Sequence, residues 1–139
     1  MSRPLAYLSG PITRGDRSHN VCQFMQAHEI LMDKGYAVIN PGLTGLLPWA
    51  WEKSHAAWLE SDLPIVERCD WVIRLPGESI GADMETDHAE KHGIPVLYVD
   101  NLKILERLEH VGEHEGHQPE GRRRDTEGAG VVLAAAAAH

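Results

Sequence analysis

Short apolar runs alternate with amphipathic helical patterns along residues 1–110, and turn-forming residues separate them. Such runs, bounded by glycine, proline or asparagine, are typical of buried strands. They cover four stretches, at 4–9, 36–39, 71–75 and 94–99. Since helices separate the strands, we predict a parallel sheet with helices on both faces. The expected fold class is α/β, a flavodoxin-like or Rossmann-like open sandwich with a four- to five-stranded parallel sheet.

The first helical pattern is expected to start at a Ser18 cap and to end at Gly35. The side chains that recur at three- and four-residue spacing lie on one helical face. They are Val21, Phe24, Met25, His28, Leu31 and Met32.

Three more helical patterns follow along the chain. One opens at Ser54 and continues to Cys69, with an interruption at Pro64. The other two span about 79–92 and about 102–110. Gly93 follows the pattern at 79–92, and a glycine at this place usually ends a helix.

Residues 42–53 combine helix-breaking glycines and a proline with strongly apolar side chains. These side chains are Leu43, Leu46, Leu47, Trp49 and Trp51. A hydrophobic loop of this kind covers a pocket or meets another subunit. Because Trp49, Trp51 and Trp58 are clustered and the domain is small, we expect a homo-oligomer, a dimer or higher.

Composition and charge exclude several classes of function. Of the 139 residues, 42% are hydrophobic and 24% are charged, which is the balance of one ordinary globular domain and not of a disordered chain. The net charge is −8, from 21 acidic against 13 basic residues. This charge disfavours a nucleic-acid polymer or an anionic membrane as partner, but it allows a small anionic ligand in a local pocket. The nine histidines are scattered without an HExxH or CxxC setting, so we predict no metal site.

Apolar runs, cysteines and composition indicate the compartment and the domain organisation. No apolar run approaches the roughly 20 residues of a membrane-spanning helix, and the first residues lack the pattern of a secretory signal. Cys22 and Cys69 lie in separate helical patterns, which argues against a disulfide framework and favours the cytoplasm. We expect an α/β domain over residues 1–110 and a C-terminal extension over 111–139, rich in Gly, Glu and Arg and then in Ala. The extension is either mobile or docked on a partner, and its Val-Leu-Ala end can alternatively pack on a neighbouring subunit.

Ligands of open parallel sheets bind beyond the carboxyl ends of the strands, here the loops 10–18, 40–53 and 76–79. Glu85 belongs to a helical stripe that is expected to face the sheet or this cleft. The stripe comprises Gly81, Met84, Glu85, His88, Ala89 and His92. Burying an uncompensated carboxylate costs several kcal/mol, so its position in the stripe indicates a functional site. The alternative is a boundary glutamate that reaches solvent.

Other polar residues near this edge have both functional and purely structural interpretations. Ser79 either caps its helix only or also contributes to an anion site with the free N–H groups. Arg14 and Arg17 either hold a phosphate or belong to a solvated loop. Asp62 either caps the helical segment that follows it or stands at the carboxyl edge of the sheet. Tyr7 either points into the cleft or fills the core.

Four short motifs occur in order along the chain. They are Tyr7-Leu8-Ser9-Gly10-Pro11, then Asp62-Leu63 followed by Cys69-Asp70, then Leu75-Pro76-Gly77, and finally Ser79-x-Gly81-Ala82-x-x-Glu85. In this order and spacing they resemble the nucleoside 2-deoxyribosyltransferase superfamily, which includes 2′-deoxynucleoside 5′-monophosphate N-glycosidases. The resemblance covers about residues 4–100, and the C-terminal extension has no counterpart in it.

The resemblance implies a role for each matching residue. Glu85 would be the nucleophile that attacks C1′ of the sugar, Asp62 would help to protonate the departing base, and Tyr7 would orient Glu85. The residues implied to bind the substrate are Ser9, Gly10, Pro11, Ile12, Arg14, Arg17, Ser79 and Gly81. No metal or other cofactor is implied.

The expected activity is cleavage of the N-glycosidic bond of a (2′-deoxy)nucleoside or its 5′-monophosphate through a glycosyl-enzyme intermediate, with transfer to water or to another nucleobase. A carboxylate stabilises the positive charge that develops on the sugar, while a second group delivers a proton to the base. The alternatives are a nicotinamide-dinucleotide glycohydrolase, which shares the sheet and the glutamate, and a non-catalytic nucleotide-binding module. A purely structural role would make the apolar loop an assembly surface.

Overall fold

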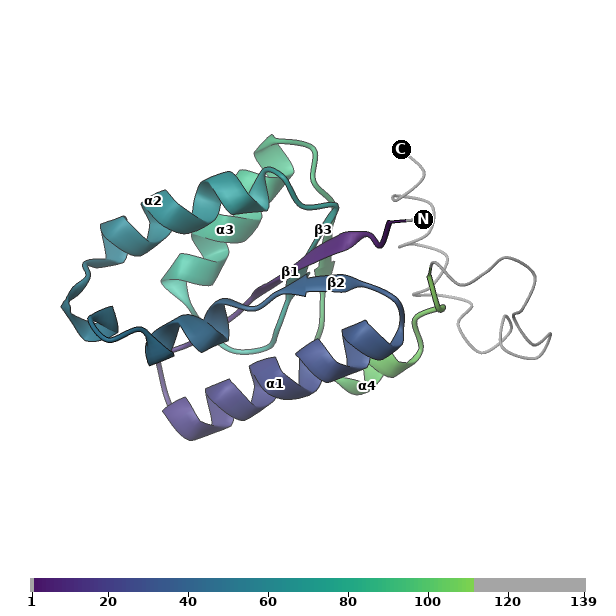
Figure 1. Ribbon diagram of the computed structural model, residues 1–139, viewed down its shortest axis with the longest axis horizontal. Coiled ribbons are helices and arrows are strands. Elements are labelled where there is room, and N and C mark those ends of the chain that lie inside the picture. Colours follow the sequence, from purple (N-terminus) through teal and green to yellow (C-terminus); the bar gives the residue numbers. More distant parts are fainter. Residues whose placement is uncertain (1, 112–139) are drawn as a thin grey trace.

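The computed structural model describes residues 2–111, in which a parallel sheet lies between two layers of helices (Figure 1). The elements in chain order are β1 (Leu5–Ser9), α1 (Arg17–Asp33), β2 (Ala37–Ile39), the 3-10 helices η1 (Pro41–Leu46) and η2 (Ala50–Glu52), α2 (His55–Val66), β3 (Trp71–Arg74), α3 (Ile80–Lys91), β4 (Val96–Tyr98) and α4 (Lys103–Glu106). The C-terminal extension predicted for 111–139 lies outside the described residues, apart from residue 111. Within the described part, no helix combines the length and the apolar character needed to cross a membrane.

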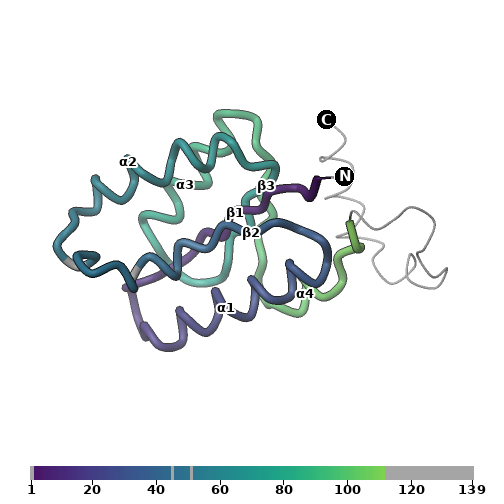
Figure 2. The backbone as a smooth tube through the Cα atoms, in the orientation of Figure 1, coloured from purple at the N-terminus to yellow at the C-terminus, as the bar shows by residue number. Residues whose placement is uncertain are grey.

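The four described strands pair in the order β2-β1-β3-β4, and every pair is parallel. Helices α2 and α3 cover one face of the sheet, and α1 and α4 cover the other (Figure 2). This arrangement confirms the α/β open sandwich and its parallel sheet. Because β2 and β3 lie on opposite sides of β1, the strand order reverses between β1 and β3, which is where open sheets bind ligands.

The strands send alternate side chains to two separate apolar clusters, as strand geometry requires. Ala6 and Leu8 of β1 join a cluster with α1 and α4. Tyr7 points to the opposite face, where it packs with residues of α2, β3 and α3. Ser9, two residues after Tyr7, lies on this second face as well, opposite Arg74 in the sheet register.

The N-terminus of α1 differs from the prediction. The helix begins at Arg17, and its cap is Asp16, whose carboxylate accepts hydrogen bonds from the backbone N–H groups of Ser18 at 3.0 Å and His19 at 3.2 Å. A carboxylate is as good a cap as a hydroxyl, and its charge also favours the N-terminal end of the helix dipole. The predicted cap, Ser18, therefore lies inside the first turn.

The buried face of α1 also differs in part from the predicted one. Val21 and Met32 are 40% and 50% exposed, whereas the polar residues Asn20 and Gln23 are buried. The Asn20 amide donates to the backbone carbonyls of residues 12 and 14, at 3.2 and 2.8 Å, and the Gln23 amide donates to that of Pro76 at 3.1 Å. These hydrogen bonds compensate the burial of the two amides, and they fix the loops at the end of the sheet onto α1.

Helix α2 continues through Pro64 and is not interrupted there. Ser54 caps it as predicted, with its hydroxyl accepting from the N–H of Ala57 at 3.1 Å. Proline removes the hydrogen bond to the carbonyl four residues earlier, but both Pro64 and Glu60 are exposed, so water can satisfy that carbonyl. Asp62 is therefore an interior residue of α2 and caps no helix.

Smaller corrections concern the connecting segments. The predicted loop at 42–53 contains the two 3-10 helices, and the last helical pattern shortens to the single turn of α4. The glycines predicted to end the first and third helices adopt positive φ, +97° at Gly35 and +73° at Gly93, as such ends require. Both cysteines are free thiols.

Candidate active site

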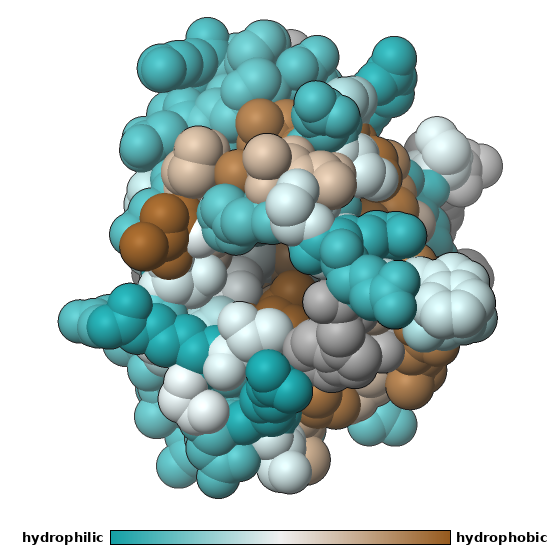
Figure 3. All heavy atoms as spheres, turned by 90° about the vertical axis from the view of Figure 1, so that its left-hand side faces the viewer, coloured by the Kyte–Doolittle hydropathy of each residue, from teal (hydrophilic) through white to brown (hydrophobic). Residues whose placement is uncertain are grey.

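A pocket of about 420 Å³ opens at the carboxyl ends of β1 and β3. This volume is within the range of small-molecule sites. Figure 3 faces this end of the molecule and shows a hollow with apolar residues in its depth and hydrophilic residues around it. The lining comes from the end of β1 and the loop after it, from α1, from η1 and η2, and from the facing sides of α2 and α3. The pocket therefore lies at the predicted edge of the sheet.

Glu85 is the buried carboxylate of this pocket. Its side chain comes from α3, lines the cavity and is 8% exposed. The Tyr7 hydroxyl donates to its Oε2 at 2.8 Å, and the Ser9 hydroxyl donates to its Oε1 at 2.7 Å. Both donors stand on one face of β1, because alternate strand residues point the same way. Each oxygen of Glu85 thus has one hydroxyl donor from the strand below it.

Burial has the largest effect on the pKa of Glu85. Loss of hydration raises the pKa of Glu85 to about 7. The hydrogen bonds from Ser9 and Tyr7 oppose this shift, the Asp62 carboxylate adds to it, and Arg74 opposes it. The pKa of Tyr7 is itself raised well above its usual range, mainly by burial, so the phenol keeps its proton and stays a donor.

Asp62 supplies the second acid of the pocket. It lies half-buried on α2 and lines the cavity together with Glu85. Burial raises the pKa of Asp62 above its ordinary value, and hydrogen bonding with Tyr7 partly offsets that rise. Two acids with raised pKa values beside one cavity are a common arrangement for acid–base chemistry.

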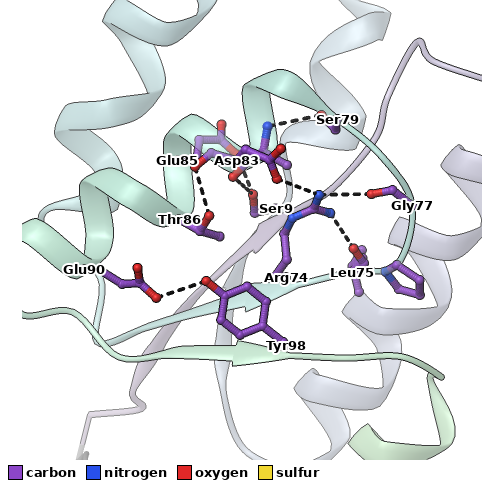
Figure 4. Close-up of polar contacts among 12 residues, drawn as sticks. Ser9, Arg74, Leu75, Gly77, Ser79, Asp83, Glu85, Thr86, Glu90 and Tyr98 are labelled. Carbon is purple, nitrogen blue, oxygen red and sulfur yellow. Dashed lines mark hydrogen bonds and ion pairs between the residues drawn. The ribbon is translucent and has the colours of Figure 1, made fainter.

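Arg74 fixes the start of α3 to the sheet. Its guanidinium donates to the carbonyls of Leu75 at 2.6 Å and Gly77 at 3.0 Å, and to the Asp83 carboxylate at 3.2 Å. In Figure 4 the side chain extends from β3 toward the first turn of α3, close to Ser9 and Glu85. Arg74 therefore holds the loop between β3 and α3 in the conformation that aims α3 at the pocket.

The N-terminus of α3 forms one wall of the pocket. Ser79 is its N-cap, and its hydroxyl accepts from the N–H of Ala82 at 3.1 Å. A Cβ on Gly81 would lie 3.1 Å from the His55 ring, so glycine permits the close approach of α2 to this end. Lys53 and Arg14 also line the cavity, and Arg14 pairs with Glu78 at 3.0 Å on the exposed rim. Helix N-terminal N–H groups and cations are groups that can bind an anion.

The predicted residues divide into three groups. Seven of them line the pocket: Gly10, Ile12, Arg14, Asp62, Ser79, Gly81 and Glu85. Tyr7 and Ser9 lie beneath the pocket and hold Glu85. Pro11 and Arg17 are not among the lining residues: Pro11 is buried against the turn at Gly77, and Arg17 is the first residue of α1.

Sequence reasoning missed four residues of this region: Lys53, His55, Trp58 and Arg74. Lys53 is the last residue of the loop 40–53 that is predicted to approach the ligand, and His55 and Trp58 follow it in α2. Because these residues come at or just after a helix-breaking segment, the sequence does not show whether their side chains point toward the pocket. The signal for Arg74 was its spacing, since a charged residue two positions after buried Val72 must share its face of the sheet.

The exposed apolar residues near the pocket include Leu46, Trp49 and Ile80, which are 82%, 65% and 66% exposed. The homo-oligomer expected from the apolar segment stays a prediction.

In the predicted stripe of α3, Glu85 and Ala89 are buried, but Met84 is 43% exposed. The buried residues of α3 are Ala82, Glu85, Thr86 and Ala89.

Comparison with known proteins gives a family for the part of the chain that contains the sheet. Comparison with curated proteins finds no significant match. Residues 4–98, more than half of the chain and all four described strands, match the family described as "Domain of unknown function (DUF4406)". The chain belongs to this family.

Proposed function

We propose that this protein cleaves the N-glycosidic bond of a (2′-deoxy)nucleoside or its 5′-monophosphate, with Glu85 as the nucleophile. One observation carries the proposal: a carboxylate that is 8% exposed lines a substrate-sized pocket, and a hydroxyl donor holds each of its oxygens. Burial of this kind is costly and serves no packing purpose, so it favours a chemical role. The resemblance to the nucleoside 2-deoxyribosyltransferase superfamily supports the same role.

In the first step, a carboxylate oxygen of Glu85 forms a bond to C1′ of the sugar as the bond from C1′ to the base nitrogen breaks. Positive charge develops on the sugar in the transition state, and the adjacent carboxylate stabilises it. The bonding electrons leave with the base, which takes a proton from the carboxylic acid of Asp62. The products of this step are the free base and a glycosyl ester of Glu85.

Hydrogen bonding to Glu85 and burial of Asp62 support this division of roles. Glu85 must be ionised to attack, and its hydrogen bonds from Tyr7 and Ser9 stabilise the ionised form. Asp62 must carry a proton, and burial raises its pKa in the required direction. Ionisation of Glu85 raises the affinity of Asp62 for a proton in turn, since two nearby carboxylates disfavour the doubly ionised state.

The second step releases the sugar from Glu85. Asp62, now ionised, accepts a proton from water as the water oxygen attacks C1′ and the ester bond to Glu85 breaks. If another nucleobase attacks in place of water, the reaction is a transfer. The same residues serve both outcomes, and access of a second base to the pocket decides between them.

A 5′-monophosphate is the substrate form that the pocket wall favours. Ser79 at the N-terminus of α3 and the cations Lys53 and Arg14 all line this pocket. A phosphate there would interact with the helix dipole and with both cations. We expect Lys53→Gln to lower kcat/KM for a monophosphate about tenfold, which corresponds to about 1.4 kcal/mol, and to leave that for the nucleoside nearly unchanged.

A panel of nucleosides and 5′-monophosphates, incubated with and without an acceptor base, tests the function. Liquid chromatography measures the released base for the wild type and for Glu85→Gln, whose side chain has the same shape. We expect base release by the wild type and its loss in the variant. Saturable nucleotide binding without base release would instead indicate a binding module, and release of ADP-ribose from a nicotinamide dinucleotide would indicate the other glycohydrolase.

A further inference from the structure

A cluster of three potential metal ligands lies where α2 ends against α3, away from the pocket lining. The ligands are the carboxylate of Glu67, the C-cap residue of α2, and the imidazoles of His88 and His92 in the last turn and at the C-cap of α3. One donor atom from each residue lies within 4.8 Å of the others. We propose that these three side chains bind a divalent transition-metal ion of the zinc class and thereby link α2 to α3.

Side-chain rotation brings the three donor atoms to the geometry of a zinc site. Nε2 of His88 lies 2.7 Å from Oε2 of Glu67, and Nε2 of His92 lies 3.8 Å from the same oxygen. Ligand atoms about 2.0–2.1 Å from a tetrahedral zinc ion stand about 3.3 Å apart. The first distance must therefore lengthen and the second shorten, each by about half an ångström. The donor atoms of the two histidines lie within 4.8 Å of each other and must approach by up to about 1.5 Å, which rotation of these partly exposed side chains allows.

The histidine spacing provides the preorganisation of the site. Residues four apart on a helix project side by side, and the two rings lie with their centroids 4.3 Å apart. Nδ1 of His92 is 2.9 Å from the backbone carbonyl of His88. Since only an N–H can donate to a carbonyl, this contact puts the proton of neutral His92 on Nδ1 and leaves Nε2, the atom that faces Glu67, free to bind a metal.

The ligand set selects the class of ion. Two imidazoles and one carboxylate suit zinc and its neighbours in the first transition row, whereas magnesium and calcium prefer oxygen ligands alone. Three protein ligands leave a fourth position for water. The charge is also suitable: the ligand set brings one negative charge to a divalent ion, and the neighbouring Arg68 guanidinium donates to the Pro64 carbonyl instead of entering the cluster.

The position of the cluster suggests what the ion would do. Glu67 follows Asp62 on the α2 segment, and His88 follows Glu85 by about one turn of α3. A metal bond between these helix ends would hold the two acids of the pocket in a fixed relation without touching the substrate. The inference concerns metal binding and helix linkage, and it stands whether or not the proposed activity is correct.

Thermal unfolding with and without zinc chloride tests the site in the full chain. Saturating zinc should raise the Tm of the wild type by about 5 °C or more, because an ion that binds only the folded state stabilises it. The same concentration of magnesium chloride should not change the Tm. His92→Gln and Glu67→Gln should each lose most of the zinc-dependent rise, measured against their own metal-free Tm.

The matched control is His19→Gln, which removes an exposed histidine from the start of α1. Zinc held by other histidines or by a thiol adds the same signal to every variant, so the control should keep the full rise. The proposal is overturned if zinc leaves the wild-type Tm unchanged. It is equally overturned if His92→Gln keeps more than half of the wild-type rise.

Discussion

The two faces of the sheet use the same strands for opposite purposes. On the face covered by α1 and α4, Ala6, Leu8 and Ile73 are fully buried among apolar side chains. On the face covered by α2 and α3, the alternate positions of β1 bring Tyr7 and Ser9 against the carboxylate of Glu85. The comparison shows how one strand builds a core on one side and a polar site on the other.

The two faces also differ in their contribution to stability. Apolar burial on the α1 and α4 face stabilises the fold in proportion to the area removed from water. Burial of Glu85 acts in the opposite direction, because its hydration is lost and only two hydroxyl donors replace it. A site of this kind is retained for its chemistry, so mutations on the two faces should separate activity from stability.

Glu85→Ala should have the largest effect on activity. We expect base release to fall at least about a thousandfold, which corresponds to roughly 4 kcal/mol of barrier, while the protein remains folded. Steady-state base release measures the rate, and circular dichroism checks the fold. A rate within tenfold of the wild type would remove Glu85 from its role.

Ile73→Ala is the matching change on the opposite face. Ile73 is fully buried, and truncating it leaves a cavity in the α1 and α4 cluster. The free energy of unfolding should fall by about 2–5 kcal/mol. Denaturant titration measures this loss. Base release per folded molecule should be unchanged, and a large drop in it would show that the two faces are not separable.

The pH dependence of stability should report Glu85 directly. Its pKa is raised from 4.5 to about 7, so between these values the folded state holds a proton that the unfolded state has lost. The stabilisation is fully present below pH 4.5 and is lost as the pH rises through about 7, a loss of about 3 kcal/mol.

The matched variant for this prediction is Glu85→Gln, which cannot ionise. The difference in unfolding free energy between the wild type and the variant, followed by denaturant titration from pH 4 to pH 8, isolates the Glu85 contribution. We expect the wild type to lose stability relative to the variant as the pH rises. A difference that is flat with pH would mean that Glu85 titrates as an ordinary exposed carboxylate.

Tyr7→Phe should have the smallest effect of the series. Loss of the hydroxyl removes one of the two donors to Glu85, so the pKa of Glu85 should rise further and the acid limb of the kcat/KM profile should move to higher pH. At neutral pH we expect about a tenfold loss, roughly 1.4 kcal/mol. Tyr36→Phe, the same change among the residues of the α1 and α4 cluster, should leave the profile in place.

The strands and the position of Glu85 could be predicted because both depend on local patterns. Strand runs end at turn-forming residues, and a helical stripe identifies a buried glutamate without reference to its partners. The buried face of α1 could not be predicted in the same way. Asn20 and Gln23 are buried because they satisfy carbonyls of the loops after β1 and β3, and only the fold brings those carbonyls within reach.

Within the candidate site, too, local sequence patterns predict some residue roles, and others depend on the fold. Ser79 was predicted as a cap from its place before a helix, and it is one. For Asp62 the sequence leaves two roles open, a helix cap or a place at the carboxyl edge of the sheet. Helix α2 continues through Pro64, so Asp62 caps no helix, and it lines the pocket. The roles of Lys53, His55 and Trp58 depend on how the 3-10 segment folds toward α3, which residue spacing does not encode.

Detection of the glycosyl ester on Glu85 tests the central claim most directly. Enzyme mixed with a substrate from the base-release panel is quenched in acid within the first turnover, digested, and analysed by mass spectrometry. We predict a sugar or sugar-phosphate adduct on the peptide that contains Glu85, in proportion to the base released in that turnover. Base release with the Glu85 peptide unmodified, and with Glu85→Gln still active within tenfold of the wild type, would contradict the account.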